Sequence, residues 1–235
     1  HGAFSHWLNG NTGKVHPFSQ MDDGGDLVET AFLMQGLITA REYFKSGSAY
    51  EKILCDTITK LWERVEWDWY RNSNQNKLFW HWSPDYTWSM NMSITGWNEA
   101  LIVFVLAASS KTHSIPKSVY DEGWARKGAF PMKNGKTFYG IQLPLGEDYG
   151  GPLFFAHYSF LGLDPRKLND QYANYWNQNV SHTLINNKYC IANPKSRRGY
   201  GINCWGLTAS DIQYGYSASS PSNDLGVIAP TAALS

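Results

Sequence analysis

The sequence predicts an all-α fold, a double-layered α/α toroid with short β-hairpin inserts. Segments that are apolar around most of a helix circumference alternate with segments that carry a single apolar face. The stretches between these helix pairs alternate polar and apolar residues around turns, as hairpins do. A toroid with buried inner and amphipathic outer helices fits this alternation, and an irregular helical bundle would give a similar one.

The first helix pair is the clearest. Residues 26–44 are apolar over most of the helix circumference, which predicts packing on more than one side. Ser48 is a favoured N-cap residue, and residues 49–66 have a narrower apolar stripe, which is typical of a surface helix. We therefore expect an antiparallel pair of one buried and one outer helix.

The same alternation continues along the chain. Residues 96–108 are nearly all apolar, and a short amphipathic helix is expected to start at Pro116. Residues 151–161 are apolar and aromatic, and residues 168–185 are amphipathic. A fourth buried helix is expected at 204–209, so that inner and outer helices alternate about three and a half times by the helical period.

Two inserts are expected to be hairpins. Residues 77–91 alternate around Pro84 and Asp85, and residues 135–143 follow the turn-forming pair Asn134-Gly135. Long aromatic loops at one end of a helical toroid are expected to line a binding cleft.

The composition excludes several functional classes. The 235 residues include 20 Lys and Arg against 20 Asp and Glu, and 15% are aromatic, which argues against disorder and against nucleic-acid binding. No apolar run is long enough for a membrane span. Three widely spaced cysteines argue against a disulfide framework, although a Cys190–Cys204 bridge stays open. No zinc-binding spacing occurs, so neither a metal nor a cofactor is expected.

Acidic residues gather at the start of the first buried helix. Asp22, Asp26 and Glu29 are spaced i, i+4, i+7, which places them on one helical face. Acids at a helix start cap it and meet the positive end of its dipole, which is sufficient to explain the two aspartates. It does not explain Glu29, one turn inside an apolar helix.

Two more acids occupy comparable positions. Glu99 precedes the second apolar helix, and Asp211 follows the fourth apolar segment. If three inner helices present Glu29, Glu99 and Asp211 at one end, these carboxylates converge on the toroid axis. Converging carboxylates suit glycoside hydrolysis, in which one protonates the leaving oxygen and another activates water or attacks the sugar.

Tryptophans accompany these acids. Indole faces stack on the apolar faces of sugar rings, so tryptophans in loops and at helix mouths are candidate sugar-binding residues. The candidates are Trp80, Trp82, Trp88, Trp97 and Trp205.

A competing motif overlaps the first acids. Asp22-Asp-Gly-Gly-Asp matches the aspartate-rich motif with which isoprenoid synthases hold magnesium on a diphosphate. Two glycines disfavour a continuous helix there, no second acidic motif follows, and no Lys or Arg gathers near the acids. This alternative is therefore the weaker one.

Several motifs occur together along the whole chain. They are His1-Gly-Ala-Phe-Ser-His-Trp-Leu, Gln20-Met-Asp-Asp-Gly-Gly-Asp-Leu-Val-Glu, Trp80-His-Trp-Ser-Pro-Asp, Gly96-Trp-Asn-Glu, Tyr149-Gly-Gly-Pro-Leu-Phe-Phe-Ala-His and Trp205-Gly-Leu-Thr-Ala-Ser-Asp. Together they resemble the bacterial glycoamylase-like family of glycoside hydrolases, most closely its endo-β-1,2-glucanase branch. The resemblance implies an (α/α)6 toroid, of whose single catalytic domain residues 1–235 form a fragment.

The resemblance also implies a function. It implies inverting hydrolysis of a β-glucan, most closely β-1,2-glucan, with an acidic pocket formed by Asp22, Asp26, Glu29, Glu99 and Asp211. Glu99 is expected to be the general acid, because its apolar setting should raise its pKa. Asp22, Glu29 or Asp211 would then act on the water.

Further sugar contacts are expected from polar and aromatic side chains: Asp26, Arg41, Trp88, Tyr149, His157 and Tyr214. A monomeric bacterial enzyme, exported to the periplasm or the outer surface and acting on an oligo- or polysaccharide, is expected. A non-catalytic glycan-binding protein on the same scaffold and a glucoamylase-like hydrolase of α-glucans are the alternatives.

Overall fold

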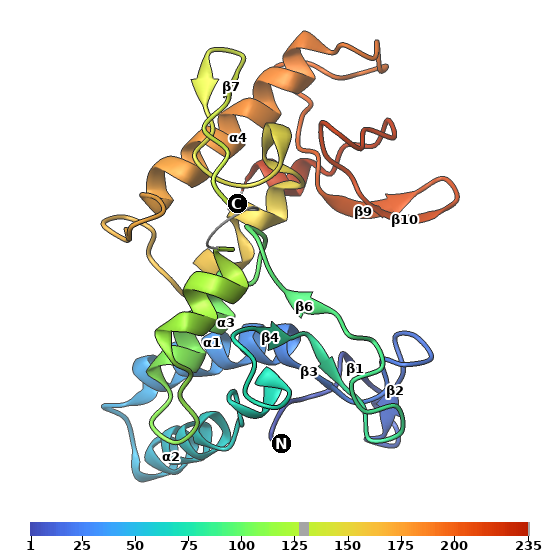
Figure 1. Ribbon diagram of the computed structural model, residues 1–235. Helices are drawn as coiled ribbons and strands as arrows, with labels where there is room; N and C mark the ends of the chain where they lie inside the picture. The colour runs from blue at the N-terminus through green and yellow to red at the C-terminus, as the bar shows by residue number, and fades with distance from the viewer. Residues whose placement is uncertain (127–131, 235) are drawn as a thin grey trace. The chain divides into compact units, whose positions relative to one another are not determined.

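The computed structural model describes residues 1–126 and 132–234 (Figure 1). The chain separates into two compact units. Within the described residues, the first unit contains 1–96 and 100–126, and the second contains 97–99 and 132–234. Both units combine helices with short two-stranded hairpins.

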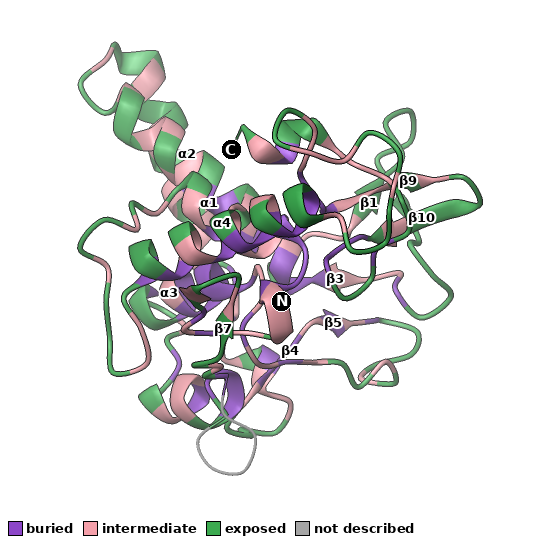
Figure 2. Ribbon diagram, turned by 90° about the horizontal axis from the view of Figure 1, so that it is seen from above, coloured by how far each residue is buried: buried purple, intermediate pink, exposed green. Residues whose placement is uncertain are grey.

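Three α-helices organise the first unit: α1 (Leu27–Phe44), α2 (Ala49–Glu63) and α3 (Leu101–Ser109). Helix α1 packs against both α2 and α3. Helix α2 buries only Ile58 and exposes most of its length, which confirms the predicted surface helix (Figure 2). Its start is fixed by a capping box between Ser48 and Glu51.

Helix α3 is a core helix. Six of its nine residues are buried. It begins five residues later than expected, because Gly96 adopts φ +76° and the chain turns before Leu101. The short helix expected after Pro116 is a π-helical turn, η2 (Val119–Trp124), whose buried Trp124 ring lies 5.0 Å from the Phe104 ring.

The remaining elements of the first unit are small. They are β1 (Trp7–Leu8) with β2 (Val15–His16), β3 (Gly25–Asp26) with β5 (His81–Trp82), β4 (Leu78–Phe79) with β6 (Ser93–Ile94), and the 3₁₀-helix η1 (Trp69–Arg71). The hairpin expected around Pro84 and Asp85 is confirmed by an antiparallel bridge between Ser83 and Thr87. The pairing of β3 with β5 joins segments far apart in sequence, and it places Asp26 opposite His81.

The second unit is built around helix α4 (Tyr175–Ala192). Its other elements are β7 (Thr137–Phe138) with β8 (Ile141–Gln142), β9 (Ala209–Ile212) with β10 (Gly215–Ala218), and the 3₁₀-helices η3 (Asp148–Gly150), η4 (Leu153–Ala156), η5 (Tyr158–Leu161) and η6 (Pro230–Ala233). Helix α4 starts at an Asn174 cap and extends beyond the predicted 168–185, to a left-handed Asn193.

The prediction of two buried helices in the second unit, at 151–161 and 204–209, is wrong. Residues 151–161 form η4 and η5, because successive hydrogen bonds span three residues instead of four. Residues 204–209 are not helical: Gly206 adopts φ +118°, and Leu207 bonds through its backbone to Asn186 and Leu153. A short apolar run has no period that separates helix from extended chain, and these tertiary hydrogen bonds decide it.

The hairpin expected at 135–143 forms, but its turn lies elsewhere. Asn134 and Gly135 bond to Pro144 and Leu143 in the paired arms. The turn is at residues 139–140, both of which have positive φ, as the tightest hairpin turns require. In the part of the chain that the structure describes, no helix is long and apolar enough to cross a membrane.

Candidate active site

The acidic segment before α1 is shaped by two close backbone approaches. A Cβ on Gly24 would lie 2.2 Å from the carbonyl oxygen of Trp82, and a Cβ on Gly25 would lie 2.2 Å from the hydroxyl of Tyr70. Only glycine fits at both positions. The segment is also held from both sides, because Asp26 N–H donates to Phe4 O at 2.8 Å and Leu27 N–H donates to Trp80 O at 2.9 Å.

Asp26 is the fully buried centre of the site. It is the N-cap of α1, and its Oδ1 accepts from the backbone N–H groups of Val28 and Glu29, both at 2.9 Å. Its Oδ2 lies 3.0 Å from His6 Nδ1 and 3.3 Å from His81 Nε2. Both carboxylate oxygens are therefore engaged, one by the helix and one by two histidines.

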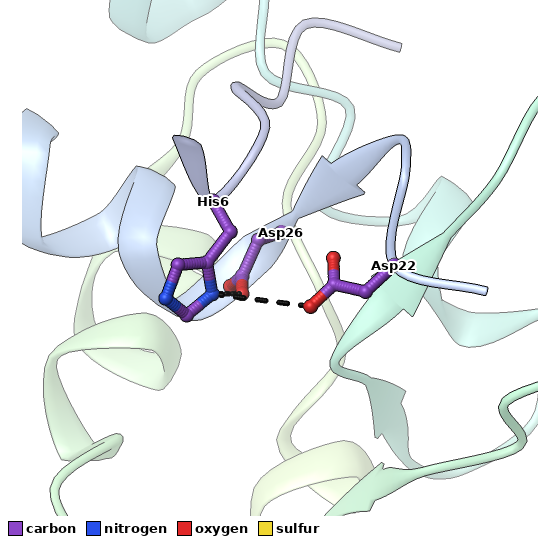
Figure 3. Close-up of side chains that lie close together, drawn as sticks. All are labelled: His6, Asp22 and Asp26. Atoms are coloured by element: carbon purple, nitrogen blue, oxygen red, sulfur yellow. Dashed lines mark hydrogen bonds and ion pairs between the residues drawn. The ribbon is translucent and has the colours of Figure 1, made fainter. Parts of the chain in front are cut away.

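Asp22 lies beside Asp26, and His6 Nδ1 faces both carboxylates (Figure 3). Its Oδ2 is 3.1 Å from His81 Nε2 and 3.9 Å from His6 Nδ1. Ionised carboxylates only accept hydrogen bonds, so these two histidine nitrogens carry the hydrogens. Asp22 is 3% exposed, and its Oδ1 has no partner among residues 1–126 and 132–234.

The environment separates the proton affinities of the three acids. Burial opposes the ionisation of Asp26, but hydrogen bonds from His6, His81 and the Glu29 backbone outweigh it and lower the Asp26 pKa. Burial raises the pKa of Glu29, and the neighbouring Asp26 charge raises it further. Burial likewise raises the pKa of Asp22. One ionised carboxylate thus sits beside two that hold their protons more tightly.

The pKa of His6 is raised by the same pairing that lowers the pKa of Asp26. The hydrogen bond to Asp26 raises the pKa of His6, against the lowering effect of burial. His6, Asp22 and Asp26 each present one ligand-type atom within 4.8 Å of the others, as a cation site would require. His6 Nδ1 lies at a hydrogen-bond length of 3.0 Å from Asp26 Oδ2 and at 3.9 Å from Asp22 Oδ2, so the histidine is paired with Asp26 as the cluster stands.

The other two predicted acids belong to the second unit. Glu99 is half-buried, precedes α3, and accepts a hydrogen bond at its backbone oxygen from Ser159 Oγ. Asp211 is exposed on β9, opposite Tyr216, and not at the end of a buried helix as expected. The structure therefore groups Asp22 and Glu29 around Asp26 in one unit, with Glu99 and Asp211 in the other.

Three predicted tryptophans lie in the first unit, near the acidic segment. Trp82 pairs with Gly25 in the β3–β5 ladder. Trp80 stacks on the ring of His81 with 6.2 Å between centroids. Trp88 packs edge-on against Tyr70, at 5.8 Å.

The other two predicted tryptophans pack in the second unit. Trp97 is 6% exposed and stacks on Tyr175 at 5.6 Å. Trp205 packs on a buried cluster that contains Tyr189 and Leu207. Packing accounts for both rings.

Arg41 lies near the C-terminal end of α1, about 22 Å along the helix from Asp26 at 1.5 Å per residue. Its guanidinium donates to Thr59 at 3.2 Å and lies 5.7 Å from the Trp62 ring centroid. These contacts join α1 to α2.

The predicted sugar contacts of the second unit occupy three different segments. Tyr149 adopts φ +65° and packs on Phe138 at 4.3 Å. His157 lines a cavity of about 490 Å³ with Trp176, and burial lowers its pKa. Tyr214 is 88% exposed between β9 and β10.

A match to a known family shows to which family the chain belongs. Residues 91–235 match the Glycoamylase family, whose description reads "Putative glucoamylase". The chain belongs to this family. Among its relatives is the exo β-1,2-glucooligosaccharide sophorohydrolase (non-reducing end) of Parabacteroides distasonis, which is 45% identical over the whole chain. The chain spans 35% of that protein.

Solved structures agree with this family relationship. The endo-β-1,2-glucanase of Chitinophaga pinensis, in complex with sophorotriose and glucose, is 55% identical with a TM-score of 0.95 over all of this chain and 57% of that one. The β-1,2-glucanase of Parabacteroides distasonis is 45% identical with a TM-score of 0.96, over all of this chain and 36% of that one.

His6 and His81 of this glycoamylase-family chain are not among the site residues that the sequence predicts. Their acidic partners lie 16 to 59 residues away, so no local spacing connects them. The available signal was their position next to tryptophan in two of the recognised motifs, His6 before Trp7 and His81 between Trp80 and Trp82. The Cys190–Cys204 bridge left open by the sequence does not form, and all three cysteines are free.

Proposed function

We propose that this chain forms part of a single (α/α)6 toroid catalytic domain that hydrolyses β-1,2-glucan with inversion. Membership of the Glycoamylase family and relatives named as β-1,2-glucan hydrolases support the reaction class. The helices and short hairpins of both units are compatible with that toroid.

The acidic cluster at the start of α1 carries the proposal. An inverting glycoside hydrolase needs one carboxyl that holds a proton and another that is ionised. Environments that push neighbouring carboxyl pKa values apart are how enzymes provide both at one pH. Here burial raises the pKa of Asp22 and Glu29, whereas two histidines keep Asp26 ionised.

We assign the general acid to Glu99, and the activation of water to Asp22, Glu29 or Asp211. The raised pKa of Glu29 makes it the second candidate for the acid. An inverting pair would hold its carboxyl groups about 6.5–9.5 Å apart, leaving room for the water.

The tryptophans beside the cluster would hold the sugar. Trp80 and Trp82 flank His81 on β5, where their indoles can stack on glucose rings. The same proposal includes a monomer that works outside the cytoplasm, in the periplasm or on the outer surface, where a polymeric glucan is accessible.

The decisive assay gives the complete protein β-1,2-glucan, an α-1,4-glucan and a β-1,3-glucan, and follows new reducing ends. We expect cleavage of β-1,2-glucan alone, and NMR of the first product should show the α-anomer. Cleavage of the α-glucan alone would refute this substrate assignment and favour a glucoamylase-like activity.

Glutamine substitutions distinguish an enzyme from a glycan-binding protein. Glu99→Gln and Glu29→Gln should each lower kcat by about 10²–10⁴, as expected for loss of an acid or base, with glycan binding retained in calorimetry. Glu42→Gln is the matched control, because the ion pairs of Glu42 within residues 1–126 and 132–234 are with Arg41 and Lys45, away from the cluster on the surface of α1. Full activity in both test variants would exclude both assignments.

A further inference from the structure

We propose that His6 and His81 are positioning residues, which hold the Asp22–Asp26 pair in its working charge state and orientation. This inference rests on the proposed hydrolase function. Neither histidine needs to touch the sugar for this role, because both act through the carboxylates that they contact.

The geometry assigns His81 as the bridge between the two aspartates. Its single Nε2 lies 3.1 Å from Asp22 Oδ2 and 3.3 Å from Asp26 Oδ2. Two adjacent carboxylates repel each other when both are ionised, and a shared N–H reduces that repulsion. The ring is also fixed, because His81 is 9% exposed and lies opposite Asp26 in the β3–β5 ladder.

His6 completes the arrangement from a different segment. Its Nδ1 contacts the same Asp26 oxygen at 3.0 Å. Its ring stacks on Phe18 with 4.3 Å between centroids, so its orientation is set by packing. Asp26 therefore receives two histidine donors on one oxygen while its other oxygen caps α1.

Two buried polar atoms of the cluster have unused hydrogen-bonding capacity. Asp22 Oδ1 and His81 Nδ1 are buried and have no partner among residues 1–126 and 132–234. Buried polar atoms without partners are costly, and each calls for an explanation, such as a role in the site or a bound water. Asp22 Oδ1 is thus the acceptor available to a water or a sugar hydroxyl, and His81 fixes the direction in which it points.

The electrostatic consequence has a definite sign. The negative charges of Asp22, Asp26 and Glu29 raise the pKa of His6. The charge of Asp23 contributes to raising the pKa of Asp22, and the charge of Asp26 contributes to raising that of the buried Tyr70 hydroxyl. The positive charge of His6 lowers the pKa of both Asp22 and Glu29. Removing that charge should therefore shift the pH–activity profile toward higher pH.

Asparagine and glutamine substitutions test the positioning role, because each amide can replace one particular ring N–H of histidine. Asparagine can place an N–H where His6 Nδ1 lies, and glutamine can place one where His81 Nε2 lies. We therefore expect His6→Asn and His81→Gln to keep kcat within about threefold. In the crossed variants, His6→Gln and His81→Asn, the amide N–H does not lie where the ring nitrogen was. Each should lose tenfold or more in kcat with little change in KM.

The pH profile provides a second measurement. Both His6 variants should shift the limbs of the kcat/KM profile by several tenths of a pH unit or more toward higher pH. His113→Gln is the control: it breaks a comparable pair, His113 Nδ1 to Asp68 Oδ1 at 3.0 Å, away from the cluster, and should leave the profile unchanged.

Equal losses in matched and crossed variants, or unmoved pH limbs, would overturn the proposal. Activity that disappears with a chelator and returns with a divalent cation would also overturn it, because the cluster would then hold an ion.

An NMR titration of the histidine ring protons separates this inference from the function itself. In the full-length protein, His6 should titrate above its ordinary range, and Asp26→Asn should return it downward by at least half a pH unit. A wild-type protein inactive on β-1,2-glucan would refute the function, whereas an ordinary His6 titration would refute the pairing.

Discussion

Replacing Gly25 with alanine tests how closely β3 is held against the core beneath the acidic cluster. The new Cβ would lie 2.2 Å from the Tyr70 hydroxyl and 3.1 Å from the Ala3 Cβ. Tyr70 is 1% exposed, so its ring has no solvent space to move into. Either β3 or the tyrosine ring must shift, and β3 carries Asp26.

The expected cost follows from these distances. Overpacking a rigid site costs about 1–3 kcal/mol, and the smaller unfolded-state entropy of alanine returns about 0.4–1 kcal/mol. Tyr70→Phe removes the closest atom and leaves the ring carbon at 3.5 Å, which is ordinary contact. The cost of Gly25→Ala should therefore fall by about 1 kcal/mol in the Tyr70→Phe background.

Urea unfolding of the wild type, Gly25→Ala, Tyr70→Phe and the double variant measures the coupling free energy between positions 25 and 70. Gly36→Ala in α1 is the matched control: its Cβ meets nothing within 4 Å, so it should stabilise the protein by about 0.5–1 kcal/mol. An equal cost of Gly25→Ala in both backgrounds, or no cost at all, would refute the close contact. We also expect a lower kcat from Gly25→Ala, because the displaced strand carries the cluster.

Three further perturbations have defined outcomes. Ser48→Ala removes the capping box of α2 and should cost about 1 kcal/mol in urea unfolding without changing kcat; a larger loss of activity would contradict this. Asp224→Ala removes the acceptor of two tyrosine hydroxyls, one of them Tyr189 at 2.9 Å, and should cost about 2–4 kcal/mol in thermal unfolding; a neutral result would contradict the assigned bonds. Because Asp26 raises the pKa of His6, the stability from this pair is fully present below about pH 6.5 and is lost as pH rises through the folded-state pKa. The free energy of unfolding should therefore fall less steeply between pH 6 and 8 in His6→Asn, and identical slopes would exclude this linkage.

Long periodic segments were predictable from the sequence, and short apolar ones were not. Helices α1 and α2 begin within one residue of their expected starts, because a cap residue and a long apolar pattern coincide. Residues 151–161 and 204–209 are too short to establish a period, and their conformation is set by hydrogen bonds to distant segments. Asp211 consequently lies on a hairpin strand.

The candidate site was predictable in part. The spacing of Asp22, Asp26 and Glu29 indicated one cluster, and the structure brings them together with unequal pKa shifts. The histidines were missed because no local pattern predicts how they reach Asp26. His81 reaches it through the two-residue β3–β5 ladder, and His6 reaches it from the segment before β1. The expected shared helical face was wrong, because Asp22 and Asp26 precede α1, which begins at Leu27. Nearness along the chain was visible in the sequence, whereas contacts between distant segments were not.

The pairing of β3 with β5 has a consequence for how the protein is made. Asp26 meets His81 only after a further 55 residues have left the ribosome, which takes about 3–11 s at about 5–20 residues per second. Helix α1 has its own cap and can form earlier, but the two aspartates at its start lack their contact with His81 until then. A nascent or partly unfolded chain that keeps α1 but lacks this ladder would therefore be helical without the histidine that bridges Asp22 and Asp26.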